Sequence, residues 1–119
     1  MSAIILGKLT LDEVIHGDLF DITFDIEDIN LSGKTLLMQV RLEQDLPVIV
    51  EFKESDGSLL KTVTSNILTT VRLLKSSVAM KQVQLGFYKH SIIMYTSADD
   101  EQTIIDGLFT VVEKIAEKP

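Results

Sequence analysis

The sequence contains no cysteine and no tryptophan, and it has only two prolines, Pro47 and Pro119. Without cysteine the chain forms no disulfide and offers no thiolate as a nucleophile or as a metal ligand. A small fold held together by disulfides is therefore excluded. No stretch rich in proline, glycine or serine suggests a linker, so we predict a single domain over residues 1–119.

Basic residues are also scarce. Eleven lysines and arginines stand against eighteen aspartates and glutamates, which gives a net charge of -7 and a pI near 4.7. Phosphate backbones and anionic lipids repel such a chain, so we predict neither nucleic acid nor a membrane as a partner. The apolar run at residues 3–6 lacks a basic flank and is far shorter than the ~20 residues that span a bilayer. We therefore expect no signal peptide and no transmembrane segment.

Alternation of apolar and polar residues is what the sequence has in abundance. In the clearest segment four apolar residues interleave with four polar ones: Phe20-Asp21-Ile22-Thr23-Phe24-Asp25-Ile26-Glu27. Because side chains alternate between the two faces of a strand, this pattern predicts a strand with one buried face. The same pattern predicts inward side chains in two further strands: Leu36, Met38, Val40 and Leu42, then Val48, Val50 and Phe52.

Turn residues separate these strands. Asp56-Gly57 tolerates the positive φ of tight turns, so residues 48–53 and 59–64 are predicted to pair as a hairpin. Further strands are predicted at residues 4–10, 66–74, 87–95 and 103–112, with residues 97–102 as a hairpin loop. Ser76 or Ser77 can cap a short helical turn before Val83. About seven or eight strands with so little helix indicate an all-β antiparallel sandwich.

The segment Val83-x-x-Gly86-x-Tyr88 resembles the tyrosine corner of immunoglobulin-like domains, in which a tyrosine hydroxyl bonds back to the main chain. The cysteine and tryptophan of antibody domains are missing. The resemblance therefore implies an Ig-like β-sandwich of seven or eight strands, with one short helical turn and no disulfide, in which the ring of Tyr88 is buried.

A second resemblance follows the order of short motifs along the chain: His16-Gly17-Asp18-Leu19-Phe20, Asn30-Leu31-Ser32-Gly33-Lys34-Thr35, Gln39-Val40-Arg41, Gly86-Phe87-Tyr88, Ile92-Ile93-Met94 and Gly107-Leu108-Phe109-Thr110-Val111. This order is similar to that of the small β-sandwich domains among phage and prophage tail and baseplate proteins, such as the N-terminal domain of siphophage upper baseplate proteins. The resemblance implies a non-enzymatic structural or assembly protein of the tail or baseplate. It would bind other tail proteins, in the virion or in the bacterial cytoplasm during assembly.

Candidate chemical sites are few. Ser32-Gly33-Lys34-Thr35 looks like the end of a phosphate loop, but a strand pattern follows it where a helix is required, so we predict a turn. Asp21, Asp25 and Glu27 lie too far apart along a strand to converge on a cation, and Asp99-Asp100-Glu101 is predicted to be a solvated hairpin tip. The two histidines lack metal-ligand spacing, and His90 is predicted to be a buried structural residue. We expect no metal, no cofactor and no catalytic residue.

Two strands place apolar residues on both faces, which favours an interaction surface. Ile49 and Ile93 are predicted to face outward, together with Leu37, and to invite contact with a protein partner or a second copy of the chain. The leading hypothesis is therefore a structural protein that holds protein neighbours. The alternatives are a ligand-binding or adhesion module of Ig-like fold, for glycan or protein, and a small hydrolase.

Overall fold

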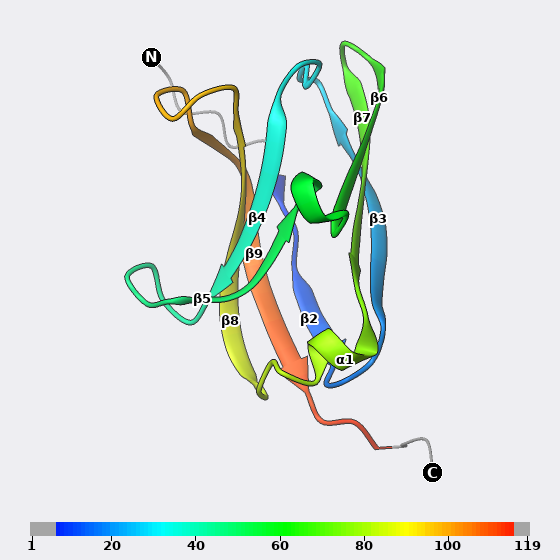
Figure 1. Cartoon of the computed structure of the whole chain (residues 1–119), viewed down its shortest axis with the longest axis vertical. Coiled ribbons are helices and arrows are strands. Elements are labelled where there is room, and N and C mark those ends of the chain that lie inside the picture. The colour runs from blue at the N-terminus through cyan, green and yellow to red at the C-terminus, as the bar shows by residue number, and fades with distance from the viewer. Residues whose placement is uncertain (1–6, 116–119) are drawn as a thin grey trace.

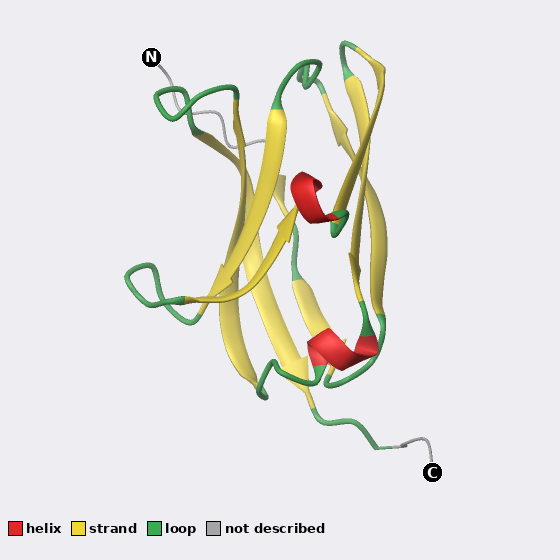
Figure 2. Ribbon diagram, viewed as in Figure 1, coloured by secondary structure: helices red, strands yellow, loops and turns green. Residues whose placement is uncertain are grey.

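Two sheets packed face to face build the protein, and the computed structural model describes residues 7–115 (Figure 1). Nine strands, one 3-10 turn and one short helix follow one another along these residues: β1 (Gly7–Lys8), β2 (Leu11–Ile15), β3 (Phe20–Glu27), β4 (Thr35–Arg41), β5 (Val48–Lys53), η1 (Glu54–Asp56), β6 (Leu59–Ser65), β7 (Leu68–Lys75), α1 (Ser77–Met80), β8 (Gly86–Tyr95) and β9 (Gln102–Val112). Figure 2 shows how little of this chain is helical.

The strand order is that of an Ig-like sandwich. The large sheet has the order β1-β9-β8-β4-β5, with β2 also paired to β9, and the small sheet has the order β3-β7-β6. A four-stranded path β9-β8-β4-β5 opposite a three-stranded sheet is the arrangement of immunoglobulin domains. The predicted Ig-like β-sandwich is confirmed. The pairings are antiparallel except those of β1 and β2 with β9, which are parallel.

The N-terminal strand differs from the prediction for residues 4–10. Residues 4–6 lie outside the described residues, β1 covers only Gly7–Lys8, and β2 was not predicted. The register of β2 against β9 shifts between Leu11 and Val14, which leaves both Asp12 and Glu13 exposed. Two successive polar residues break the alternation that identifies a strand. The unpredicted strand β2 therefore brings the count to nine strands within residues 7–115.

The core lies between the two sheets and follows the alternation closely. Phe20 and Ile26 of β3 are buried, as are Leu36, Met38 and Val40 of β4. The rings of Phe20 and Phe52 lie 5.3 Å apart and those of Phe20 and Phe109 lie 5.6 Å apart, measured between centroids, so aromatic packing joins the sheets. Leu42 was predicted to face the core but is 47% exposed, because β4 ends at Arg41.

The predicted hairpin of residues 48–53 and 59–64 is wrong. β5 pairs with β4 in the large sheet, whereas β6 pairs with β7 in the small sheet. A two-residue type I′ turn needs positive φ at both positions, but Gly57 has a φ of 80° and Asp56 has no positive φ. The 3-10 turn η1 ends at Gly57 instead. Phe52 and Leu59 are both buried, from opposite sheets. The segment between them therefore crosses the sandwich.

The short helix and the corner after it were predicted correctly. The Ser76 hydroxyl accepts a hydrogen bond from the Ala79 amide and caps α1. Tyr88 is 7% exposed, and its hydroxyl donates to the Gln84 carbonyl oxygen over 2.8 Å. This is the predicted tyrosine corner. The predicted hairpin of β8 and β9 is also present.

Candidate functional site

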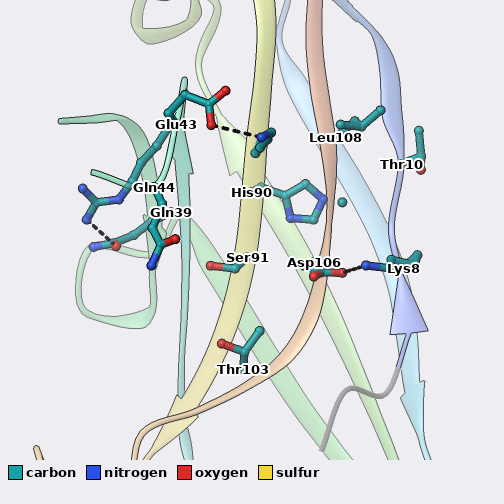
Figure 3. A pocket seen from close by; sticks show the side chains of 13 residues that line it. Lys8, Thr10, Gln39, Glu43, Gln44, His90, Ser91, Thr103, Asp106 and Leu108 are labelled. Atoms are coloured by element: carbon teal, nitrogen blue, oxygen red, sulfur yellow. Dashed lines mark hydrogen bonds and ion pairs between the residues drawn. The ribbon is translucent and has the colours of Figure 1, made fainter. Parts of the chain in front are cut away.

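The outward side of the large sheet is the strongest candidate for a functional surface, and we call it the large-sheet face. Its side chains alternate with the core residues of β4, β5, β8 and β9: Leu37, Gln39, Arg41, Ile49, Glu51, Phe87, Lys89, Ser91, Ile93, Asp106 and Leu108. An open groove of about 780 Å³ runs over this face, between Lys8 and Thr10 on one side and Glu43 and Gln44 on the other (Figure 3).

Charged groups of both signs line the groove and form two ion pairs. The Lys8 ammonium lies 2.6 Å from an Asp106 carboxylate oxygen, and the Lys89 ammonium lies 3.0 Å from one of Glu43 (Figure 3). The Arg41 guanidinium completes the set of three cations and two carboxylates in the lining. In a chain with a net charge of -7, this surface is close to neutral.

Two apolar side chains at this face are exposed, Leu108 in the lining of the groove and Phe87 outside it. Phe87 is 82% exposed and Leu108 is 51% exposed. Phe87 is opposite Thr110 and Lys89 is opposite Leu108 in the β8–β9 register, so Phe87 and Leu108 are diagonal neighbours on one face. Scattered exposed apolar residues are ordinary, whereas neighbouring ones on one face are a candidate contact surface.

The residues predicted to carry this surface contribute only in part. Leu37 and Ile93 lie opposite each other in the β4–β8 register and are half-buried. Ile49 faces solvent with 42% exposure, as predicted. The pair Gln39 and Glu51, joined by a 2.8 Å hydrogen bond, lies between Ile49 and Leu37. Polar side chains therefore separate Ile49 from Leu37 and Ile93.

The sequence analysis does not single out Phe87, although the alternation contains a signal for it. Tyr88 was expected to face inward, and residues adjacent in a strand face opposite sides. The same alternation that buries Tyr88 therefore turns Phe87 outward. An aromatic side chain on the solvent side of a sheet is the feature that marks the large-sheet face.

His90 points inward from β8, on the side opposite the large-sheet face, and contacts the N-terminal segment at Leu9. It is 4% exposed, as predicted for a structural histidine, and its Nε2 contacts the Leu9 carbonyl oxygen. A carbonyl only accepts, so Nε2 carries the proton, and the buried Nδ1 has no partner among residues 7–115. Gly107 is opposite His90, and its missing side chain leaves the space that the Leu9 carbonyl occupies. The gap between β1 and β2 coincides with this contact.

We expect the protein to lose stability as the pH falls below 6.5, the ordinary pKa of histidine. Burial lowers the pKa of His90, and this outweighs the Leu9 carbonyl and the Asp106 charge, which raise it. Above the unfolded-state pKa both states hold a neutral ring. Below it the unfolded chain binds a proton that the folded chain excludes, so folding becomes less favourable. Urea midpoints at about pH 7 and about pH 5.5 measure the loss.

The control for this prediction is His90→Gln, which keeps an N–H donor for Leu9 and does not titrate. Its urea midpoint should fall less than that of the unaltered protein over the same pH interval. An equal fall in both proteins would show that His90 is not the titrating group.

Two other segments have the local structure that the sequence predicts, the turn before β4 and the hairpin tip. Lys34 donates its amide to the Leu31 carbonyl, so residues 31–34 form a turn before β4. Asp100 accepts hydrogen bonds from Thr96 and Ser97 at the exposed hairpin tip, and these bonds lower its pKa to about 2. No three metal-ligating side chains of His, Asp or Glu gather within residues 7–115. Neither helix in this part of the chain has the length and apolar character needed to cross a membrane.

Two carboxylates on the acidic face of β3 accept hydrogen bonds from the neighbouring strand β7. Arg72 on the neighbouring strand β7 forms a double hydrogen bond with the Asp21 carboxylate, at 2.8 and 2.7 Å, and lowers its pKa. The Thr70 hydroxyl donates to Asp25 over 2.7 Å. These bonds hold the carboxylates apart along the sheet, so they do not converge on one point.

No protein-family model matches the chain, and no curated protein matches it. Among solved structures, the chain is similar to the ZIG-8 IG1 homodimer, with 10% identity, 88% of this chain and 80% of that chain covered, and a TM-score of 0.38. It is also similar to the ZIG-8–RIG-5 IG1-IG1 heterodimer, with 12% identity, coverage of 87% and 82%, and a TM-score of 0.36. It is also similar to the Ig1 domain of mouse SynCAM 2, with 12% identity, 89% of this chain and 94% of that chain covered, and a TM-score of 0.38.

At these values the likeness supports no conclusion about function, and the fold assignment depends on the strand order and the tyrosine corner. None of the three structures is a phage tail or baseplate protein. The resemblance to the phage family therefore stays a prediction.

Proposed function

We propose that the domain is an Ig-like protein-binding module that acts through the large-sheet face. The observation that carries this proposal is the pair of exposed neighbours Phe87 and Leu108 beside a groove lined by charges of both signs. Aromatic side chains anchor many protein interfaces, because they bury a large area at little cost in side-chain entropy. A polar rim around such an anchor is the usual composition of a protein-binding surface.

A second copy of the chain is the partner that this surface fits best. In a two-fold dimer the same face is used on both subunits. The cations Lys8, Arg41 and Lys89 of one copy can then lie near Glu43 and Asp106 of the other. Copies with a net charge of -7 repel each other elsewhere, so a nearly neutral face is where they can approach.

This proposal is the adhesion or interaction hypothesis of the sequence analysis, and it assigns the domain no catalytic activity. The tail or baseplate setting implied by the sequence resemblance is a more specific form of it. In that form the large-sheet face would hold a neighbouring tail protein. The test of that form is a binding measurement with a purified tail or baseplate protein. The unaltered domain should bind it, and the Phe87→Glu variant should not.

We expect sedimentation velocity to show concentration-dependent self-association of the unaltered protein. Phe87→Glu should remain monomeric over the same range, because it places a carboxylate at the centre of the apolar contact. The matched control is Leu60→Glu, at a residue that is 43% exposed on the small sheet, and it should associate like the unaltered protein. A monomer at every concentration would contradict the homo-oligomer.

A further inference from the structure

One side of the sandwich is open between β2 and β3. Within residues 7–115, β3 pairs only with β7, and β2 pairs only with β9. A groove of about 340 Å³ runs between these two strands, and it is lined by residues of 10–15 and 18–22. This groove shares only Thr10 with the lining of the groove over the large-sheet face.

The edge of β3 offers hydrogen-bonding groups to an added strand. All eight residues of β3 are in register with β7 on one side, without a bulge. In such a strand the amide and carbonyl groups of alternate residues point away from the partner. A regular, unpaired edge of this length is a template for another strand.

The floor of the groove is apolar. Val14 and Phe20 belong to the buried core, and Leu11 and Ile22 are partly buried against it. A strand that pairs with the edge of β3 would turn every second side chain toward these residues. The inward side chains of the added strand must therefore be apolar.

The rim of the groove is acidic. Asp12, Glu13, Asp18 and Asp21 line it, and no lysine or arginine is among its lining residues. Within residues 7–115, Asp18 and Asp21 pair with cations, Lys114 and Arg72, at 2.8 and 2.7 Å, whereas Asp12 and Glu13 do not. A second copy of the chain docked on this groove by a two-fold axis would bring its own rim carboxylates close to those of the first copy, and the like charges would repel each other. The charge complementarity therefore selects a basic partner.

We propose that the open side of the sandwich binds an extended segment of a basic protein partner, which adds as a strand to the edge of β3. The segment alternates Val, Ile or Leu, which pack on the groove floor, with Lys or Arg, which face Asp12, Glu13 and the outer carboxylates of β3. Recognition is by main-chain hydrogen bonds and by charge. The inference is independent of the proposed function, because it uses a different surface.

The test measures the affinity of labelled, end-capped peptides for the full chain by fluorescence anisotropy. The probe alternates lysine and valine over about eight residues, the length of a usual strand. We expect it to bind at least about tenfold more tightly than a peptide of the same composition with all lysines at one end. Two further forms of the probe carry N-methyl groups on alternate residues, one on the odd-numbered and the other on the even-numbered amides. We expect their affinities to differ, because only one of these two sets of amides faces β3.

The matched variants are Asp12→Lys with Glu13→Lys at the groove, and Asp99→Lys with Glu101→Lys at the distant hairpin tip. The first pair should weaken binding by about tenfold or more, and the second should leave it nearly unchanged. Equal losses from both pairs, or equal binding by both N-methylated forms, would overturn the proposal. Tighter binding by a peptide of residues 1–6, which contains no lysine or arginine, would overturn it too.

Discussion

Replacing Phe109 with alanine is expected to lower the free energy of unfolding by about 3–5 kcal/mol, the usual cost of deleting a buried aromatic ring. Phe109 is fully buried, and the tilted Phe20 ring lies 5.6 Å away and also meets Phe52. These three rings come from β9, β3 and β5, so they join the two sheets. The deletion leaves a cavity where the sheets meet. Urea denaturation followed by circular dichroism measures the loss.

Phe87→Ala is the matched control, because it removes the same ring from the opposite face of the same sheet. Phe87 is 82% exposed, so its loss should change stability by no more than about 0.5 kcal/mol in the monomer. Comparable losses in the two variants would mean that Phe87 is packed in solution and that its exposure is not as described.

Gly107→Ala is expected to destabilise the protein by about 1–3 kcal/mol or more, although it adds a single methyl group. A Cβ at this position would overlap the Leu9 carbonyl, which is backbone, and would press on the His90 ring. Relief requires the N-terminal strand to move away from β9. The thermal midpoint gives the overall loss, and hydrogen exchange at β1 and β2 should accelerate.

The control is Gly7→Ala, in the same N-terminal strand. A Cβ on Gly7 would have nothing within 4 Å. This variant should keep the stability of the unaltered protein or exceed it slightly, since alanine restricts the unfolded chain. If Gly107→Ala were equally harmless, the close approach of Leu9 to β9 would be refuted.

Alternation was sufficient to locate most of the strands. A period of two indicates one buried face, and β3, β4, β5 and β7 to β9 each have one. The pattern failed in β2, where a bulge exposes two successive residues, Asp12 and Glu13. Local sequence also identified the Ser76 cap and the Tyr88 corner, because the bonding partners of both residues lie within four positions in the chain.

The sequence did not predict which strands belong to the same sheet. The Asp56-Gly57 turn looks like a hairpin turn, but burial of Phe52 and Leu59 from opposite sheets sends the chain across the sandwich. The contact of His90 with Leu9 spans 81 positions and depends on the missing side chain of Gly107. Long-range contacts of this kind leave no local pattern.

The candidate site divides in the same way. Strand parity alone could have placed Phe87 outward, opposite Tyr88. Its neighbour Leu108 could not be assigned to it, because that requires the register of β8 on β9. The groove between β2 and β3 depends on which strands end each sheet, so it was visible only in the structure.

Site-directed disulfide trapping tests the central claim most directly, because the chain has no cysteine of its own. Single cysteines are placed at Leu108 and Thr110 on the large-sheet face and at Leu60 on the small sheet, and each protein is mildly oxidised. The account predicts disulfide-linked dimers from Leu108→Cys or Thr110→Cys and a monomer from Leu60→Cys, because the two copies of a residue approach each other where it lies near the two-fold axis, which the account places at the contact of Phe87 and Leu108. Monomers from both large-sheet variants, or equal linkage through Leu60→Cys, would contradict it.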